Sequence, residues 1–207
     1  MGGCHRVPVH VHLYVSCCAF WKPSDRKQIP RPSFDYDSLI IDIPDYPKPG
    51  VVFKDITPLL GDAAGFNAVT HAIADHFRFY GVTKVIGAEA RGFMVGAPVA
   101  HELGAGFVPA RKPGKLPREV VEEEYDLEYG TATLQIHKDA LGPGDRVIVV
   151  DDLVATGGTM VAQMDLVRSL GAELVGIACL MELEFLNPRE VLAKADAPEL
   201  FSVLQVK

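Results

Sequence analysis

Short runs of β-branched and other apolar residues alternate along the chain with longer stretches in which apolar residues recur every three or four positions. From Asp42 onward, this pattern predicts strands connected by helices. The expected helices span 66–80, 92–103 and 159–170, and the expected strands span 84–88, 106–110, 131–136, 146–150, 174–181 and 201–206. We place the last strand at a sheet edge. The order of elements predicts an α/β fold with a doubly wound, mainly parallel sheet.

Residues 1–33 lack this periodicity and contain several prolines and histidines. We expect a disordered N-terminal extension, followed by a catalytic domain at 34–207. The apolar stretch after Arg6 loosely imitates a signal peptide, but Pro8, His10 and His12 interrupt it and no small-x-small cleavage site follows cleanly. A metal site is disfavoured because the spacings match no zinc pattern; its ligands would be Cys4, His5, His10, His12, Cys17 and Cys18.

Composition narrows the possible partners. The 207 residues are 48% hydrophobic, which is enough for one packed domain. A net charge of -7 and a pI of about 5.5 argue against nucleic acid or an anionic membrane surface as the main partner. Three of the four cysteines lie in the first 18 residues and Cys179 lies in a predicted strand, so the cysteines form no disulfide framework. We expect a cytoplasmic protein.

The strongest chemical signal is the segment Asp151-Asp-Leu-Val-Ala-Thr-Gly-Gly-Thr159, which joins the predicted strand 146–150 directly to a predicted helix. The free N–H groups and positive dipole end of such a helix favour a phosphate. Gly157 and Gly158 let the backbone approach the ligand, and Thr156 and Thr159 add hydroxyl donors. Each hydrogen bond to a charged group contributes about 1.5–3 kcal/mol, so this loop can hold a phosphate without a lysine.

Asp151 and Asp152 would repel that phosphate, so a different task is expected of them. At the end of a strand they can accept hydrogen bonds from two ribose hydroxyls and favour positive charge at C1′ of the sugar. The alternative is an ordinary capped helix with Asp152 or Thr159 at the N-cap. Neither a P-loop nor a dinucleotide-binding glycine motif occurs at the required position.

Val147-Ile-Val-Val-Asp-Asp-Leu-Val-Ala-Thr-Gly-Gly-Thr159 resembles the phosphoribosyl pyrophosphate signature of the type I phosphoribosyltransferases. The resemblance implies that the whole loop, Leu153 and Ala155 included, holds the ribose 5-phosphate. Further blocks from about Asp42 to the C-terminus resemble the adenine phosphoribosyltransferases in particular. They imply the type I fold, with a small N-terminal hood at about 34–60 and a core at about 61–207.

The block Asp45-Tyr-Pro-Lys-Pro-Gly-Val-Val-Phe-Lys-Asp-Ile-Thr-Pro58 is similar to that family's base-recognition segment. The match implies that Phe53 stacks on adenine, with Val52 and Lys54 beside it. Many family members have Arg where this chain has Lys54, which leaves a side-chain contact there less secure than a backbone contact. On its own chemistry, Phe53 can equally be a buried core residue.

Two further blocks are expected to meet the diphosphate. Gly87-Ala-Glu-Ala-Arg-Gly-Phe93 resembles the family's pyrophosphate loop, which implies a contact from Arg91 and a cis peptide between Glu89 and Ala90. The segment 111–118 gathers four cations, among which we expect Arg111, Lys112 and Lys115 to collect an anionic substrate. A solvated charged face is the alternative for this run.

Glu122-Glu-Glu-Tyr-Asp-Leu-Glu-Tyr-Gly130 resembles the family's flexible catalytic loop. The resemblance implies that Glu128 is the general acid or base at the purine imidazole nitrogen, with Tyr129 close by. Closure of such a loop would exclude water from a glycosyl cation. An exposed acidic loop is the simpler interpretation of Glu122, Glu123 and Glu124.

Together these resemblances imply transfer of a phosphoribosyl group to adenine, with AMP and pyrophosphate as products. They also imply a homodimer and a Mg²⁺ ion held mainly by substrate and water, not by dedicated protein ligands. Two alternatives stay open. One is a phosphoribosyltransferase for hypoxanthine, xanthine or orotate, and the other is a ligand-sensing regulator of the same fold that binds nucleic acid, which the acidic composition disfavours.

Overall fold

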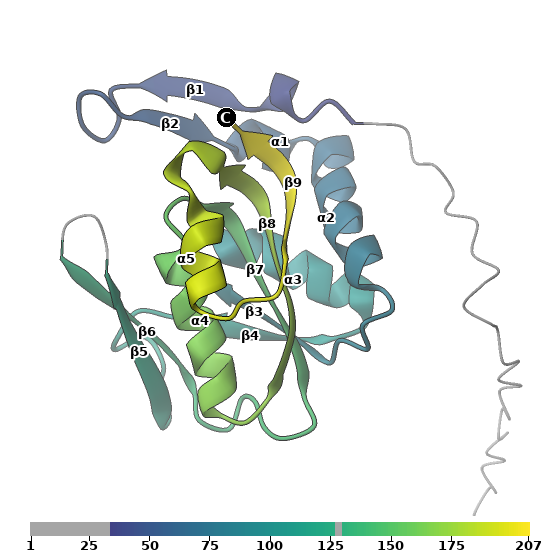
Figure 1. Cartoon of the computed structure of the whole chain (residues 1–207). Coiled ribbons are helices and arrows are strands. Elements are labelled where there is room, and N and C mark those ends of the chain that lie inside the picture. Colours follow the sequence, from purple (N-terminus) through teal and green to yellow (C-terminus); the bar gives the residue numbers. More distant parts are fainter. Residues whose placement is uncertain (1–33, 127–129) are drawn as a thin grey trace, which may run out of the picture. The chain divides into compact units, whose positions relative to one another are not determined.

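A five-stranded parallel sheet lies at the centre of the computed structural model, which describes residues 34–126 and 130–207. Its order is β4-β3-β7-β8-β9, and every neighbouring pair is parallel. The strands are β3 (Lys84–Ala88), β4 (Gly106–Ala110), β7 (Arg146–Val154), β8 (Glu173–Leu183) and β9 (Leu200–Val206). The expected parallel sheet is confirmed, and β9 lies at an edge as predicted (Figure 1).

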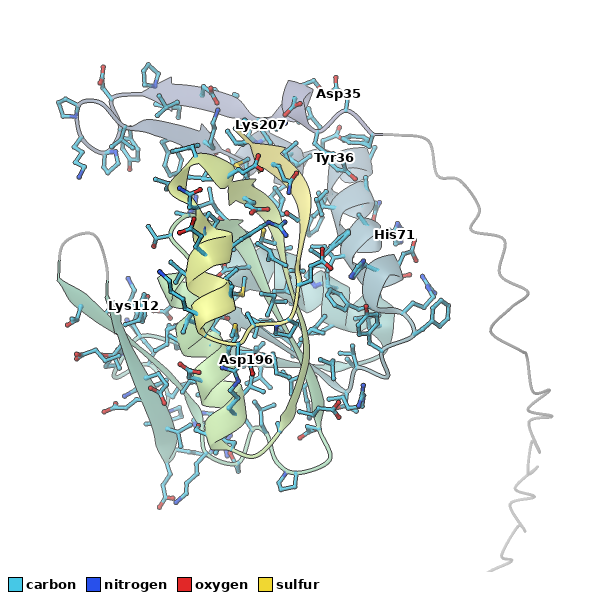
Figure 2. All side chains as sticks on the ribbon, viewed as in Figure 1. Asp35, Tyr36, His71, Lys112, Asp196 and Lys207 are labelled. Atoms are coloured by element: carbon cyan, nitrogen blue, oxygen red, sulfur yellow. The ribbon has the colours of Figure 1, made fainter. Side chains whose placement is uncertain are left out.

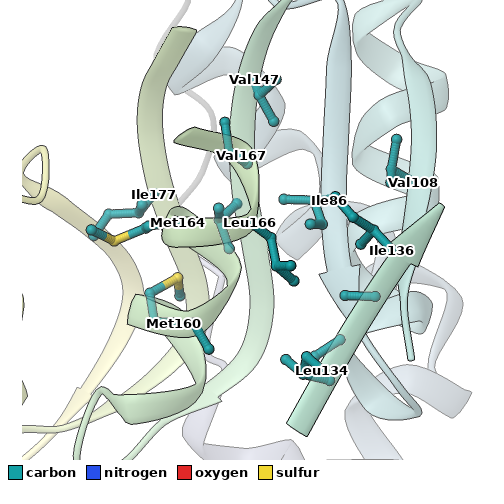
Figure 3. Packing of buried hydrophobic residues seen from close by; sticks show 14 of the residues in the cluster. Ile86, Val108, Leu134, Ile136, Val147, Met160, Met164, Leu166, Val167 and Ile177 are labelled. Atoms are coloured by element: carbon teal, nitrogen blue, oxygen red, sulfur yellow. The ribbon is translucent and has the colours of Figure 1, made fainter. Parts of the chain in front are cut away.

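Helices cover both faces of this sheet. Helices α1 (Thr57–Gly61), α2 (Ala63–Phe77) and α3 (Arg91–Leu103) pack on one face, where β7 contributes Ile148 and Val150. Helices α4 (Gly158–Ser169) and α5 (Pro188–Lys194) pack on the other face, against Val147 and Val149 (Figure 3). Successive side chains of a strand point to opposite faces, so the apolar run in β7 is buried on both sides.

Some boundaries differ from the predicted ones. Helix α2 starts at Ala63, not Phe66, because the Asp62 side chain caps it by accepting a hydrogen bond from the Gly65 N–H at 2.7 Å. Strand β7 continues beyond Val150 to Val154, since its pairing with β8 continues through Leu153 and Val154. The short helices α1 and α5 carry too few turns for periodicity to reveal them.

The predicted strand 131–136 does not join the central sheet. Strand β6 (Thr131–His137) pairs antiparallel with β5 (Val120–Asp126) in a separate two-stranded sheet, whose Leu134 and Ile136 pack into the α4 side of the core. An alternating apolar pattern predicts a strand but not its partner, which explains the wrong assignment. The acidic residues expected in a loop, Glu122 to Glu124, therefore lie within β5.

A third, small sheet precedes the core. It consists of β1 (Ile41–Pro44) and β2 (Val52–Asp55), which pair antiparallel after the 3-10 helix η2 (Asp37–Leu39). All four residues of β1 are exposed. This hairpin falls within the predicted hood, although the proposed boundary between hood and core stays a prediction. The extension 1–33, with its expected disorder and its cysteines, lies outside the described residues.

The central sheet opens between β3 and β7. Strand β3 pairs with β4 on one side and with β7 on the other, so the direction of strand order reverses between β3 and β7. Pairing of β3 with β7 stops at Val149, whereas β7 continues along β8 to Val154. Crevices at such a reversal, beyond the carboxyl ends of the strands, are where α/β proteins bind ligands. Over the described ranges, no helix has the length and apolar character to cross a membrane.

Candidate active site

A cavity of about 600 Å³ occupies this crevice. Its walls are the turn between β3 and α3, the end of β7, the loop into α4 and the first turn of α4. Ten of the predicted site residues line it: Arg91, Lys112, Asp151, Asp152, Leu153, Ala155, Thr156, Gly157, Gly158 and Thr159. The structure therefore brings together residues that the sequence separates by more than sixty positions.

The loop after β7 reaches α4 through a left-handed glycine. Gly157 has φ 94° and serves as the N-cap residue, with no side-chain capping bond. The alternative in which Asp152 or Thr159 caps an ordinary helix is therefore wrong. The first backbone hydrogen bond of the helix runs from the Val161 N–H to the Gly157 carbonyl, so the N–H groups before Val161 have no partner within the helix. Such a turn can bind an anion.

Both carboxylate oxygens of Asp151 accept hydrogen bonds from the protein. Its Oδ1 accepts a hydrogen bond from the Asp152 N–H at 2.9 Å, and its Oδ2 accepts one from Gln163 Nε2 at 3.1 Å. Burial raises the pKa of Asp151 well above its usual value, and the neighbouring Asp152 carboxylate raises it further. Gly92 makes this position possible, because a Cβ on Gly92 would lie 2.6 Å from Asp151 Oδ1.

Asp152 has a different environment. Its Oδ2 lies 3.0 Å from Nε of Arg91, but this oxygen is buried and has no hydrogen-bond partner in the described part of the chain. Burial raises the pKa of Asp152, while the Arg91 guanidinium opposes this rise. Asp152 Oδ2 is thus ion-paired with Arg91, whereas both oxygens of Asp151 accept hydrogen bonds from protein donors.

Arg91 connects the cavity to the β1–β2 hairpin. Its guanidinium carbon lies 5.4 Å from the centre of the Phe53 ring, a cation–π distance. Phe53 is half-buried and belongs to neither buried core cluster, so it is not the ordinary core residue considered as an alternative. The Tyr46 ring meets Phe53 edge-on at 5.2 Å. Directly before Arg91, the expected cis peptide between Glu89 and Ala90 is present.

The basic run 111–118 is split between the cavity and the surface. Lys112 lines the cavity beside the β5–β6 hairpin (Figure 2). Arg111 instead holds Glu89, with 2.7 Å between Nε and Oε2, and Arg118 pairs with Asp139. Lys115 is not part of the cavity lining. Of the three cations expected to collect an anionic substrate, Lys112 lines the cavity and Arg111 and Lys115 do not.

Glu89 is a cavity residue that sequence reasoning missed. Burial alone would raise its pKa, but the Arg111 side chain, the Lys112 backbone and the nearby Lys115 together lower the pKa below its usual value. Glu89 thus stays ionised and keeps Arg111 at the edge of the cavity. A carboxylate two residues before Arg91 in the same glycine-rich turn was the available signal.

The remaining predicted residues lie elsewhere. Lys54 Nζ binds both carboxylate oxygens of Asp42 at 2.7 Å, and Val52 is 52% exposed; neither lines the cavity. Glu128 and Tyr129 lie outside the described residues. The strands on either side of them, β5 and β6, reach the cavity, which they line with three side chains: Tyr125, Ala132 and Leu134.

A further wall was not expected from the sequence. Leu186, in the 3-10 helix η3 (Glu184–Leu186), lines the cavity, and α5 follows directly. A Cβ added at Gly157 would lie 3.4 Å from the Pro188 carbonyl oxygen and 3.5 Å from Val191, so α5 packs closely against the loop. Arg189 fixes α5 to the sheet through two 2.8 Å hydrogen bonds to the fully buried Glu182.

The fold and the loop into α4 define a phosphoribosyltransferase, and residues 59–201 match the phosphoribosyl transferase domain family. The chain is 56% identical over 151 residues to the adenine phosphoribosyltransferase of Aeromonas salmonicida, which covers 73% of this chain and 83% of that protein. The chain therefore belongs to the adenine phosphoribosyltransferases.

Solved structures agree with this assignment. The adenine phosphoribosyltransferase of Thermoanaerobacter pseudethanolicus superposes with a TM-score of 0.78 at 48% identity, covering 83% of this chain and 98% of that chain. The Saccharomyces cerevisiae protein, solved in complex with an imino-altritol bisphosphate and adenine, superposes with a TM-score of 0.76 at 37% identity, covering 82% and 96%. The expected type I phosphoribosyltransferase fold is confirmed.

Proposed function

We propose that the cavity at the carboxyl ends of β3 and β7 binds phosphoribosyl pyrophosphate and transfers its 5-phosphoribosyl group to adenine, giving AMP and pyrophosphate. The observation that carries this proposal is the meeting of Asp152 with Arg91 at 3.0 Å beside the first turn of α4. This arrangement provides opposite charges next to a phosphate-binding helix end. The yeast relative, solved with a base and a bisphosphorylated sugar analogue, supports the pairing of these ligands.

The 5-phosphate is expected at the loop into α4. Backbone N–H groups of the first turn, together with the Thr156 and Thr159 hydroxyls, supply several donors that converge on one anion. Leu153 and Ala155 complete the wall of the same loop. Because Gly157 and Gly158 carry no side chain, the phosphate can approach the backbone closely.

The ribose is expected above the two aspartates. Positive charge builds at C1′ as the diphosphate departs, and carboxylates in a buried site stabilise that charge more strongly than they would in water. Both oxygens of Asp151 already accept hydrogen bonds from protein donors, so Asp152, which pairs with Arg91, is the aspartate that we expect to accept a ribose hydroxyl. Arg91 favours the ionised form that this role requires.

The diphosphate is expected between Arg91 and Lys112, with Arg111 and Lys115 contributing charge from the rim. Within 34–126 and 130–207, no group of three or more His, Cys, Asp or Glu side chains is placed to hold a metal ion. A Mg²⁺ ion fits such a site when diphosphate, ribose hydroxyls and water supply most of its octahedral oxygens. It would neutralise charge on the leaving group.

Adenine is expected at the β1–β2 hairpin. Phe53 offers its ring face for stacking, and the backbone at Val52 and Lys54 can read the edge of the base. The purine N9 attacks C1′ while Glu128 manages the proton of the imidazole ring, with Tyr129 in the same segment. We further infer a homodimer that acts in purine salvage in the cytoplasm.

The test is a substrate panel. The protein is incubated with Mg²⁺, phosphoribosyl pyrophosphate and one base at a time (adenine, hypoxanthine, xanthine or orotate), and pyrophosphate release is measured. Adenine should give by far the highest kcat/KM. Asp152→Asn should abolish most of the release, whereas the charge-matched control Asp139→Asn, on the surface beside Arg118, should not. Release with hypoxanthine but none with adenine would overturn the proposal.

A further inference from the structure

Gln163 is a polar residue in an apolar part of the core. It lies on α4, its exposed fraction is 0%, and the buried residues beside it on the helix include Met160, Met164 and Val167. Burial of an amide costs free energy that a leucine or methionine of similar size would avoid. Packing alone therefore gives no reason for a glutamine at this position.

The Gln163 amide is directed toward the cavity wall. Its Nε2 donates to Asp151 Oδ2 at 3.1 Å and approaches the Thr159 carbonyl oxygen at 3.4 Å. Thr159 lies one turn earlier on the same helix and lines the cavity. The amide oxygen Oε1 is buried and has no hydrogen-bond partner among the described residues. The side chain thus leaves one polar atom unsatisfied while its other end holds Asp151.

Asp151 is confined from three directions. Gln163 bonds one oxygen, the Asp152 N–H bonds the other, and the backbone of Gly92 at the start of α3 leaves no room for a side chain beside it. The hydrogen bond from Gln163 therefore connects α4, which follows the phosphate loop, with β7 at Asp151. The other carboxylate oxygen of Asp151 lies close to Gly92 at the start of α3, which also carries Arg91.

We propose that Gln163 is a positioning residue for the reaction: it fixes the Asp151 carboxylate and, through it, the spacing between the phosphate loop and the Arg91 turn. This inference rests on the proposed function, because that spacing must match the distance between the 5-phosphate and the diphosphate of one substrate. Gln163 touches neither ligand. Its effect reaches the substrate through Asp151.

The experiment uses two variants of Gln163 and one control in the full chain. Gln163→Met keeps the length and removes the amide, and Gln163→Glu keeps the shape but adds another carboxyl group next to Asp151, beside that of Asp152. Met164→Leu is the control, because it changes a neighbouring buried residue that is not one of the described hydrogen-bond donors to Asp151. For each variant, kcat and KM are measured separately for phosphoribosyl pyrophosphate and for adenine, together with the melting temperature.

Gln163→Met should lower kcat/KM for phosphoribosyl pyrophosphate about 10-fold, a size typical of supporting contacts behind a binding group. The KM for adenine should stay within about twofold. The melting temperature should stay close to that of Met164→Leu, because the change removes the unsatisfied Oε1 but also leaves Asp151 Oδ2 without its donor, and these two effects on stability oppose each other. Gln163→Glu should lose more activity than Gln163→Met.

Two results would overturn the inference. One is an unchanged kcat/KM for phosphoribosyl pyrophosphate in Gln163→Met. The other is an equal loss for both substrates that Met164→Leu shares, which would indicate general packing. A wild-type chain that releases no pyrophosphate contradicts the proposed function instead. Titration calorimetry with phosphoribosyl pyrophosphate on the same variants then decides on Gln163, since an unchanged Kd in Gln163→Met rejects it.

Discussion

The two ends of the proposed substrate meet parts of the molecule that are built differently. The sugar–phosphate end is proposed to lie against β7 and α4, where Asp151 and Asp152 are 6% and 5% exposed. Strand β7 pairs there with β8 and, up to Val149, also with β3. The base end is proposed to lie against the β1–β2 hairpin, in which β1 is exposed along its whole length and Phe53 is half-buried.

This difference follows from what each end must recognise. A phosphate and a developing positive charge are stabilised by fixed dipoles and charges in a site that excludes water, and such groups need a rigid, buried frame. A flat apolar base gains most from stacking on an aromatic ring, which a small exposed hairpin can provide. Arg91 contacts both regions, with Asp152 on one side and Phe53 on the other.

The largest expected effect tests the chemistry at the base end. Glu128→Gln should lower kcat by roughly 10²–10⁴-fold, because it removes the group that handles the purine proton. The melting temperature should change little. Pyrophosphate release and thermal unfolding are measured beside Glu124→Gln, an exposed glutamate of β5 that carries the same change of charge. Wild-type turnover in Glu128→Gln would contradict the role of Glu128.

Removal of the Arg91 side chain should impair the use of both substrates. In Arg91→Met, kcat/KM for phosphoribosyl pyrophosphate should fall by about 10²-fold through the lost charge. The KM for adenine should rise as well, because Phe53 loses its neighbour. Arg78→Met, which removes a surface arginine paired with Asp75, is the control. A loss confined to phosphoribosyl pyrophosphate would show that the two regions act independently.

A change at Phe53 should affect the binding of adenine but not the binding of phosphoribosyl pyrophosphate. Phe53→Leu should raise the KM for adenine about 10-fold, since stacking of a base on an aromatic ring contributes about 1–3 kcal/mol. The KM for phosphoribosyl pyrophosphate should stay within about twofold. Steady-state kinetics with each substrate varied in turn provide the measurement, and Phe79→Leu, a 61% exposed residue, serves as the matched control. Equal changes in both KM values would contradict the separation.

The smallest expected effect concerns stability. The pKa of Asp151 is raised by burial, so the folded chain binds this proton more tightly than the unfolded chain does. The free energy of unfolding therefore falls as pH rises from the unfolded pKa through the raised pKa. Asp151→Asn should avoid this loss and melt higher than the wild type at pH 7, by about 2–4 °C for each kcal/mol recovered.

Thermal unfolding of Asp151→Asn and wild type between pH 4 and 8 checks the sign of this effect. The difference in melting temperature should shrink toward acidic pH, where the wild-type carboxyl group is protonated. The amide of the variant can still bond Gln163, because it can donate to the Oε1 atom that has no partner in the described residues. Identical melting curves at every pH would show that burial of Asp151 carries no cost.

The buried half of the site was accessible to sequence reasoning, while the exposed half was less so. The apolar run of β7 and the glycines at 157 and 158 form a local pattern whose geometry follows directly from strand, turn and helix rules. In contrast, the partner of Lys54 is Asp42, which lies across a hairpin, and an ion pair of this kind depends on register.

Contacts made by chain segments far apart in sequence were also missed. Leu186 lines the cavity, and Gln163 bonds Asp151 in the cavity wall, only because the elements that carry them pack beside β7. Nothing in their immediate neighbours in the sequence indicates these contacts. A buried polar residue on an otherwise apolar helix face was a signal for Gln163, but recognising it requires knowing which face is buried. The strand at 131–136 was assigned to the wrong sheet for the same reason.

The β1–β2 hairpin is structurally separate from the central sheet. Within the described chain, these two strands form their own sheet and share no ladder with the five central strands. Mutations in 41–55 are therefore expected to leave unchanged the strand pairing of the central sheet, which supports the proposed sugar–phosphate site. Because base recognition is proposed for this hairpin, exchange of residues 41–55 between relatives is expected to alter the preferred nucleobase while the strands around the proposed sugar-donor site stay paired as before.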